Sequence, residues 1–162
     1  MDPTLQRKLN GYTRPARKDA DGTRRCRWCE GPVKPPRRTF CGDDCVHEFK
    51  LRTNPGYLRE QVWKRDRGIC ALCGCDTEEL RAKLKALREF DRSAYRTRIA
   101  ACGIPENRVW SSLWDADHDP PVSEGGGQCS LEGVRTLCIP CHHDATAALA
   151  ARRARRRRDA KL

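Results

Sequence analysis

Two histidines and one aspartate in the last third of the chain have side chains and neighbours suited to hydrolytic chemistry. Asp117 and His118 stand together before Pro120 and a run of glycines, and His142 directly follows a Cys-x2-Cys pair. A carboxylate and an imidazole are ligands for a divalent cation, and a neutral imidazole accepts a proton from water near pH 7. A lone histidine is most often a surface or satisfied core residue, but these two occur in matched contexts. The pattern makes all three candidate site residues.

Eight of the eleven cysteines form four close pairs. One pair supplies two thiolates on a tight turn and a structural zinc ion needs four, so the pairs must associate two by two. The first two pairs are near enough in sequence to close locally: Cys26, Cys29, Cys41 and Cys45. The other two are left for a second, long-range site: Cys70, Cys73, Cys138 and Cys141. We expect two structural Zn²⁺ ions, because a closed four-cysteine site has no open position for water.

Three further cysteines have no partner pattern: Cys75, Cys102 and Cys129. Cys75 is close enough to Cys73 in the sequence to compete with it as a zinc ligand. Otherwise we expect each of the three to be an ordinary free cysteine with a small, partly buried thiol. A secreted disulfide scaffold is the rival interpretation. The chain begins without an apolar signal segment, however, and an odd number of cysteines leaves one thiol unpaired. We therefore expect an intracellular protein of the cytoplasm, nucleoid or nucleus, and not a secreted one.

The formal net charge of +11 is concentrated at the two ends of the chain. Residues 1–25 carry seven Lys and Arg against three Asp, and residues 152–162 carry seven against one. Six arginines continue an Ala-rich stretch that favours helix: Arg152, Arg153, Arg155, Arg156, Arg157 and Arg158. Many charge runs serve solubility alone, but an almost unbroken arginine block favours phosphate backbones. We expect this block to bind DNA.

The composition explains why metal would be needed. With 38% hydrophobic and 34% charged residues, a chain of 162 residues has little apolar area to offset its ordering entropy. Zinc binding would supply the missing stability. No window approaches the roughly 18 consecutive apolar residues of a membrane-spanning helix, so we expect no membrane partner.

The elements that position the site follow from apolar spacing and turn residues. Three helical segments are predicted before the site. The first begins at 41–45 and ends near 54, and the second covers about 57–66. The third begins at 77 and continues, with a break, to about 103. A strand over 112–117, a glycine-rich loop, a strand over 134–137 and a helix from 140 follow. Adjacent side chains of a regular strand point to opposite faces. Asp117 and His118 therefore serve one phosphate only if the strand ends or bulges there.

The chain resembles HNH endonucleases of the four-cysteine zinc type. The resemblance is carried by residues 114–122, the glycines at 125–127 and residues 131–142. Within that family they are most similar to the HNH domains found alone in microbial and phage genomes or fused to annealing helicases. The resemblance covers roughly residues 26–151. It implies a small, zinc-stabilised α+β fold, in which a ββα-metal motif is joined by added helices and an N-terminal four-cysteine zinc module.

The resemblance also implies roles for the candidate residues. Asp117 and His142 would hold one catalytic divalent ion, and His118 would be the general base of a metal-dependent DNA endonuclease. Mg²⁺ or Mn²⁺ is the expected ion, with Co²⁺ or Ni²⁺ as alternatives, because a bound cation stabilises charge on the phosphoryl and leaving oxygens. His143 is a spare ligand if the helix phase differs by one residue.

The chain departs from the family at the residue that supplies the middle letter of its name. The family asparagine is expected five residues before Cys138, where this chain has Gly133. In the family that asparagine braces the loop and helps to orient the base. A catalytically weak or inactive zinc DNA-binding module is therefore the alternative function. Asp119 also stands where an apolar residue is common, and it would either add a metal ligand or repel phosphate.

These features divide the chain into four parts. We expect a basic flexible arm over 1–25, a four-cysteine zinc module over 26–55, an HNH nuclease domain over 56–151 and an Arg-rich tail over 152–162. RNA binding is a third interpretation that rests only on charge and aromatic residues, and nothing resembles a base-stacking sheet motif. A protein partner that supplies specificity is left open.

Overall fold

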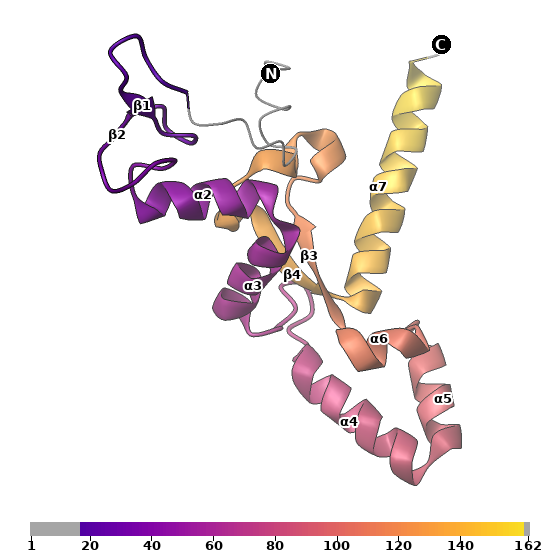
Figure 1. Ribbon diagram of the computed structural model, residues 1–162. Coiled ribbons are helices and arrows are strands. Elements are labelled where there is room, and N and C mark those ends of the chain that lie inside the picture. Colours follow the sequence, from indigo (N-terminus) through magenta and orange to yellow (C-terminus); the bar gives the residue numbers. More distant parts are fainter. Residues whose placement is uncertain (1–16, 161–162) are drawn as a thin grey trace. The chain divides into compact units, whose positions relative to one another are not determined.

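The computed structural model of the protein describes residues 17–160 (Figure 1). These residues form two units. The first contains the chain up to Gln61 together with Pro120–Gly133, and the second contains Val62–Asp119 together with the chain from Val134 onward. Within the described residues no helix has the length and apolar character needed to cross a bilayer.

The second unit is built on a ββα motif. Strands β3 (Trp114–His118) and β4 (Val134–Cys138) are antiparallel, and their register runs from Trp114 opposite Cys138 to His118 opposite Val134 without a bulge. Helix α7 (Ile139–Asp159) begins directly after β4, with a proline in its first turn, where the missing N–H costs nothing. This order is the predicted strand, loop, strand, helix, with the arginine tail included in α7 up to Asp159.

A short segment before α4 holds the outer edge of β4. Helix α3 (Pro55–Asp66) ends there, and Arg65 donates to the carbonyl of Val134 at 2.6 Å while Thr136 donates to the Asp66 carboxylate at 2.8 Å. Gly68 then turns the chain with a φ of +79°, and a Cβ at this position would lie 2.8 Å from a side-chain oxygen. Only glycine fits this turn without strain, as expected for a residue that ends a helix.

Three helices between α3 and β3 form the main apolar core of the second unit. They are α4 (Thr77–Phe90), α5 (Arg92–Ala101) and α6 (Glu106–Ser111). An aspartate caps the start of α4 and of α5 through hydrogen bonds to backbone N–H groups. The buried core residues come from all three helices and the loops beside them: Leu84, Tyr95, Ile99, Ile104, Val109 and Leu113. The sequence predicted the helical period and the break, but it did not predict α6.

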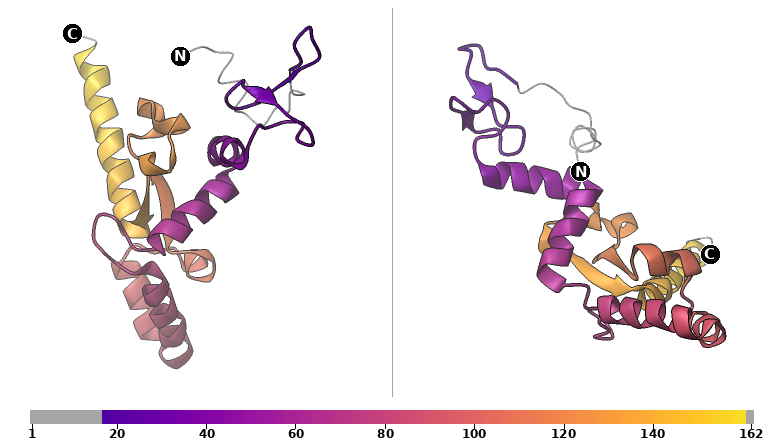
Figure 2. Two further views of the ribbon diagram at one scale, coloured as in Figure 1. Left: turned by 90° about the vertical axis from the view of Figure 1, so that its left-hand side faces the viewer. Right: turned by 60° about the horizontal axis from the view of Figure 1, so that its bottom comes forward.

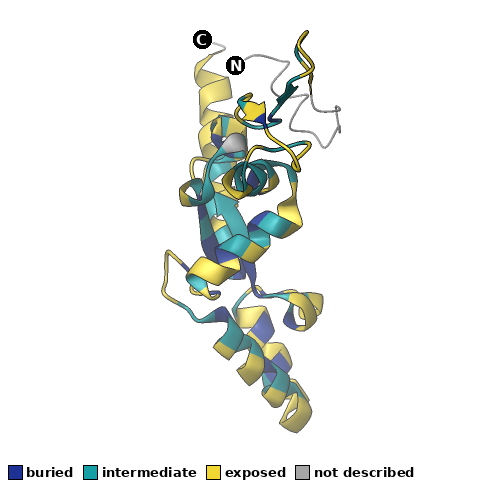
Figure 3. Ribbon diagram, turned by 60° about the vertical axis from the view of Figure 1, so that its left-hand side comes forward, coloured by how far each residue is buried: buried dark blue, intermediate teal, exposed yellow. Residues whose placement is uncertain are grey.

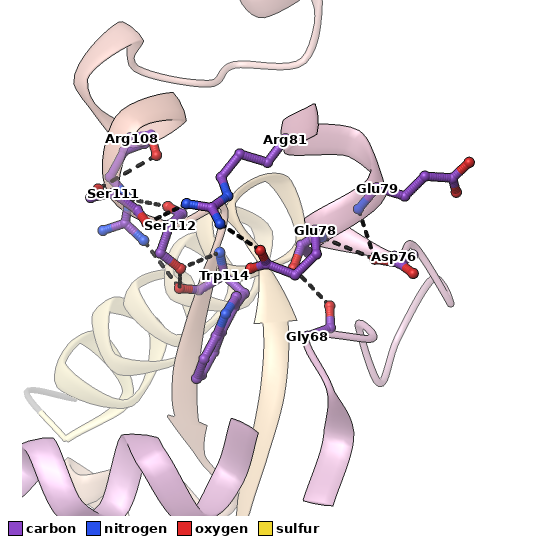
Figure 4. A network of polar contacts seen from close by, with 10 residues as sticks. Gly68, Asp76, Glu78, Glu79, Arg81, Arg108, Ser111, Ser112 and Trp114 are labelled. Carbon is purple, nitrogen blue, oxygen red and sulfur yellow. Dashed lines mark hydrogen bonds and ion pairs between the residues drawn. The ribbon is translucent and has the colours of Figure 1, made fainter. Parts of the chain in front are cut away.

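A polar network ties these helices to the entry of β3 (Figure 4). Arg81 of α4 donates to the carbonyl of Ser111 at 3.1 Å and to Glu78 at 2.6 Å. Arg108 of α6 donates to the carbonyls of Ser112 and Trp114 at 2.9 and 3.2 Å. Both arginines therefore hold backbone groups just where the strand that carries the candidate site begins.

The first unit contains a small sheet and helix α2 (Asp43–Thr53). Strands β1 (Arg24–Arg25) and β2 (Pro32–Val33) are antiparallel, and Lys18 bridges to Arg24. Residues within 17–25, which the sequence analysis placed in a flexible arm over 1–25, therefore pair with this sheet. An ion pair between Arg25 and Asp19 supplies the contact that the polar composition did not reveal. Residues 1–16 lie outside the described residues.

The segment that joins β3 to β4 also belongs to the first unit. It contains three short 3₁₀ helices: η1 (Val122–Glu124), η2 (Gly126–Gln128) and η3 (Leu131–Gly133). A Cβ at Gly126 would lie 1.6 Å from the carbonyl oxygen of Pro120, so the glycine is required by close backbone approach. With helices, few strands and two groups of cysteines, the predicted small α+β fold is confirmed.

Candidate metal centres and active site

The first cysteine tetrad lies within the first unit. Its members are Cys26, Cys29, Cys41 and Cys45, and their sulfur atoms all lie within 4.8 Å of one another. The pairs Cys29–Cys41 and Cys41–Cys45 are 3.5 and 3.4 Å apart. A tetrahedral zinc ion with bonds of about 2.3 Å places its sulfurs about 3.8 Å apart. The four residues therefore match the donor set and the size of a structural zinc site.

The second tetrad lies within the second unit and joins distant parts of the chain. Its members are Cys70, Cys73, Cys138 and Cys141, again within 4.8 Å of one another. The sulfur atoms of Cys73 and Cys138 are 3.7 Å apart, and the N–H of Ala71 donates to the carbonyl of Thr136 at 2.8 Å. The knuckle before α4 is thus attached both to the end of β4 and to the first turn of α7.

Each tetrad stabilises one thiolate before any metal binds. Burial opposes ionisation of Cys26 and Cys70, but backbone N–H groups of the same knuckle and of a residue from the other pair lower the pKa of each to about 6. Burial raises the pKa of Cys45 and Cys138 far above the usual range, and that of Cys141 to about 11. A cation is therefore needed to ionise the full set.

The three remaining cysteines stay outside both tetrads. Burial raises the pKa of Cys75 and Cys129, which disfavours the thiolate form that metals bind. Cys75 and Cys102 pack against apolar clusters. All eleven cysteines lie within the described residues and form no disulfide.

A cluster of one histidine and two carboxylates lies where α7 passes β3. Asp115 and Asp117 occupy alternate positions of β3, so they share one face of the strand. Nδ1 of His142 lies 3.4 Å from a carboxylate oxygen of Asp115, and Nε2 lies 4.0 Å from Oδ1 of Asp117. The two ring nitrogens therefore face two different carboxylates. His143, one residue further along α7, is exposed.

Two arginines that the sequence analysis did not single out hold these carboxylates. Arg135 lies opposite Asp117 in the register, donates to its Oδ2 at 3.1 Å and contacts Asp119 at 2.6 Å. Arg108 contacts Oδ1 of Asp115 at 2.7 Å. Each arginine contacts one carboxylate oxygen of its aspartate, and the other oxygen of that carboxylate faces His142. The hairpin register would have indicated Arg135, whereas nothing in the sequence indicates Arg108.

His118 is the last residue of β3 and is half-buried. β3 includes His118, which pairs with Val134 without a bulge, and the strand ends directly after this residue. Among the described residues no hydrogen bond or ion pair to the His118 ring is present. The structure thus brings Asp117 and His142 together, and His118 directly follows Asp117 in the chain.

Gly133 is the last residue of η3, and its N–H donates to the carbonyl of Ser130 at 3.1 Å. A right-handed 3₁₀ turn has negative φ, so asparagine can adopt this backbone. The next residue, Val134, is the register partner of His118. Gly133 therefore directly precedes the strand position that pairs with the candidate base.

Comparison with known proteins gives three curated relatives and one solved structure. The relatives are the DNA annealing helicase and endonuclease ZRANB3 of Mus musculus, Bos taurus and Homo sapiens, with 34%, 32% and 32% identity over 157 residues. The alignments cover 86% of this chain, and the chain spans only 15% of the length of each relative. The crystal structure of the human ZRANB3 HNH domain matches with a TM-score of 0.51 and 32% identity, over 65% of this chain and 97% of that domain. No family model matches the chain.

Proposed function

This chain belongs to the HNH-domain family, and on that premise we propose that it is a metal-dependent DNA endonuclease that hydrolyses phosphodiester bonds with one catalytic ion. The observation that carries the proposal is the approach of His142 to Asp117 within the ββα motif. The curated relatives are named as a DNA annealing helicase and endonuclease, and this name agrees with the proposed activity.

Asp117 and His142 fit the expected ion. Their facing atoms are a carboxylate oxygen and an imidazole nitrogen 4.0 Å apart. Two ligands that each lie about 2.0–2.1 Å from one ion are separated by at most about this distance. When bound, Mg²⁺ or Mn²⁺ would neutralise charge that develops on the phosphoryl oxygens. Co²⁺ and Ni²⁺ suit the same imidazole and carboxylate donors.

The side chains around the ligands have distinct tasks in this mechanism. His118 removes a proton from the attacking water, because a neutral imidazole can do so near pH 7. Arg135 orients Asp117 and offsets its charge together with that of Asp119, which reduces the repulsion of an approaching phosphate. Asp115 lies at the far ring nitrogen of His142, where it orients the ring.

Both tetrads serve as structural zinc sites in this proposal, since a four-cysteine site is closed to substrate. The second tetrad has the more direct link to catalysis. Cys141 lies in the first turn of α7 and His142 is the next residue. Holding Cys138 and Cys141 on one ion therefore fixes the point at which α7 starts and the direction in which His142 points.

DNA is the proposed partner, and an intracellular compartment is the proposed location. Six arginines at the end of α7 are exposed: Arg152, Arg153, Arg155, Arg156, Arg157 and Arg158. The block that they form is proposed to contact phosphates through part of its members. The alternative function is a catalytically weak or inactive DNA-binding module, because Gly133 replaces the family asparagine.

The decisive experiment is a plasmid-nicking assay of the full chain with Mg²⁺, Mn²⁺, Co²⁺ or Ni²⁺, against a control in EDTA. Single-stranded, duplex and branched DNA are tested in parallel. The proposal expects metal-dependent cleavage of at least one substrate. DNA binding without cleavage under every condition would overturn the enzyme and favour the binding module.

A further inference from the structure

Helix α7 joins the candidate active site to the arginine block without interruption. It runs from Ile139 to Asp159 as one helix, which Figures 1 and 2 show in yellow, starting at the end of the hairpin. Residues 150–160 are all exposed, as the yellow C-terminal part of α7 in Figure 3 shows. The arginines are therefore held on a rigid helix at set distances from His142 and at set angles around the axis.

The angles divide the arginines into two groups. At about 100° per residue, Arg153, Arg156 and Arg157 lie within roughly 60° of His142 around the axis. Arg155 and Arg158 lie roughly 140–160° away, on the opposite face. Arg152 stands at the side. We call Arg153, Arg156 and Arg157 the site-side arginines, and Arg155 and Arg158 the far-side arginines.

Burial shows that the His142 face is the face turned toward the hairpin. Ala145 and Leu149 follow His142 on this face and are half-buried, and Ala145 packs against the cluster that contains Leu137 and Cys138. Beyond Leu149 the same face is exposed and carries the site-side arginines. They project on the same side of the helix as the candidate active site.

Charge strengthens this asymmetry. The two acidic residues of α7, Asp144 and Asp159, both lie roughly 100° or more from His142 around the axis. Asp159 contacts Arg155 at 4.0 Å and so offsets part of the far-side charge. No acidic residue of α7 therefore shares the helix face of Arg153 and Arg157, and a polyanion is the complementary partner for this cationic face.

Distance along the helix sets the partner's dimensions. With a rise of 1.5 Å per residue, Arg153 and Arg157 lie about 16 and 22 Å along the axis from His142. One DNA strand carries a phosphate about every 3.4 Å of duplex axis, so along a duplex aligned with α7 this interval corresponds to about five to seven nucleotides, or roughly half a helical turn.

We propose that the site-side arginines of α7 grip backbone phosphates of duplex DNA about half a turn from the bond cleaved at His142, whereas the far-side arginines do not contact this DNA. This inference rests on the proposed function. It assigns α7 a second task as a ruler, because a continuous helix fixes the separation between the cleaved phosphate and the gripped ones.

The test compares two variants that remove equal charge from one helix segment: Arg153→Gln with Arg157→Gln, and Arg155→Gln with Arg158→Gln. Both are made in the full chain, and zinc content and helical circular dichroism verify folding. We expect the site-side pair to weaken duplex binding about tenfold and to lower the salt slope by about two, the value for two lost phosphate contacts. The far-side pair should change affinity less than twofold. Equal losses in the two variants would overturn the proposal.

The position of the grip is tested with neutral methylphosphonate linkages placed one at a time along each strand of the cleaved duplex. Interference should peak about four to seven nucleotides from the cleaved bond, on one side of it. A peak on the cleaved strand or on its complement tells which strand supplies the phosphates. Interference that is absent from both strands at this distance contradicts the ruler. If the wild type binds DNA but does not cleave it, the proposed function fails, while the affinities of the two variants still decide whether the site-side arginines grip DNA.

Discussion

The two cysteine tetrads have the same donor set but join very different lengths of chain. The first closes within residues 26–45, whereas the second links residues 70–73 to residues 138–141. A local site can stabilise only the short module around it. A long-range site brings together β4, α7 and the knuckle before α4, and so controls whether the carboxylates of β3 meet His142 at all. The same donor set therefore stabilises a local module in one unit and, in the proposed mechanism, positions the candidate active site in the other.

The largest expected effect comes from removing one ligand of the long-range site. Cys138→Ser should abolish cleavage and release one of two zinc ions, because a structural zinc site contributes on the order of 10–16 kcal/mol, as much as the stability of a whole domain. Native mass spectrometry, thermal unfolding and the nicking assay measure these outcomes.

Cys41→Ser is the matched variant of the local site. It should also release one zinc ion, but cleavage should persist at a reduced level, since the ββα motif keeps its own zinc. Equal loss of cleavage in the two variants would remove the distinction between the tetrads. A wild-type protein with a single zinc ion would contradict both sites together.

The next largest effect is expected from removing the proposed general base, which should change the cleavage rate without changing zinc content. His118→Ala should lower metal-dependent cleavage by about 10²–10⁴-fold, the usual contribution of a general base, while both zinc ions and DNA affinity are retained. The half-buried His118 ring makes no hydrogen bond or ion pair with the described residues, so its removal should leave the tetrads intact. Undiminished cleavage by the purified variant would show that another group is the base.

A smaller effect is expected from the carboxylate that orients His142 without being a proposed metal ligand itself. Asp115→Asn should weaken Mn²⁺ binding to the zinc-loaded chain by about 10–100-fold, because this carboxylate lies 3.4 Å from the far ring nitrogen of His142. Titration followed by electron paramagnetic resonance measures this affinity without any cleavage. Asp119→Asn is the control, since Asp119 contacts Arg135 and is exposed. Equal weakening in both variants would mean that only total charge matters.

The smallest effect is expected at Gly133. Gly133→Asn should raise cleavage a few-fold by restoring the family residue next to the strand position that pairs with His118. The 3₁₀ conformation there has a negative φ, which asparagine adopts without backbone strain. Gly133→Ala, which adds no amide, should leave the rate nearly unchanged. An equal gain from alanine would point to backbone stiffening instead of a polar brace.

The sequence alone was enough for most of the features that depend on local spacing, although helix α6 was missed. Cysteine pairs, the helical period of Leu80, Leu84 and Leu87, and the strand, loop, strand, helix order all appear in the structure. The assignment of pairs to tetrads was also correct, because the local option left one combination for the remaining four cysteines. Motif order identified the family for the same reason, since it is a property of the chain.

Tertiary structure decided the contacts between side chains from different elements. The clamps of Arg135 on Asp117 and Asp119, and of Arg108 on Asp115, depend on strand register and on where α6 ends. The order of residues 17–25 depends on a bridge and an ion pair that composition does not reveal. The reason is physical: spacing along a chain sets which residues share a turn or a face, but packing sets which faces meet.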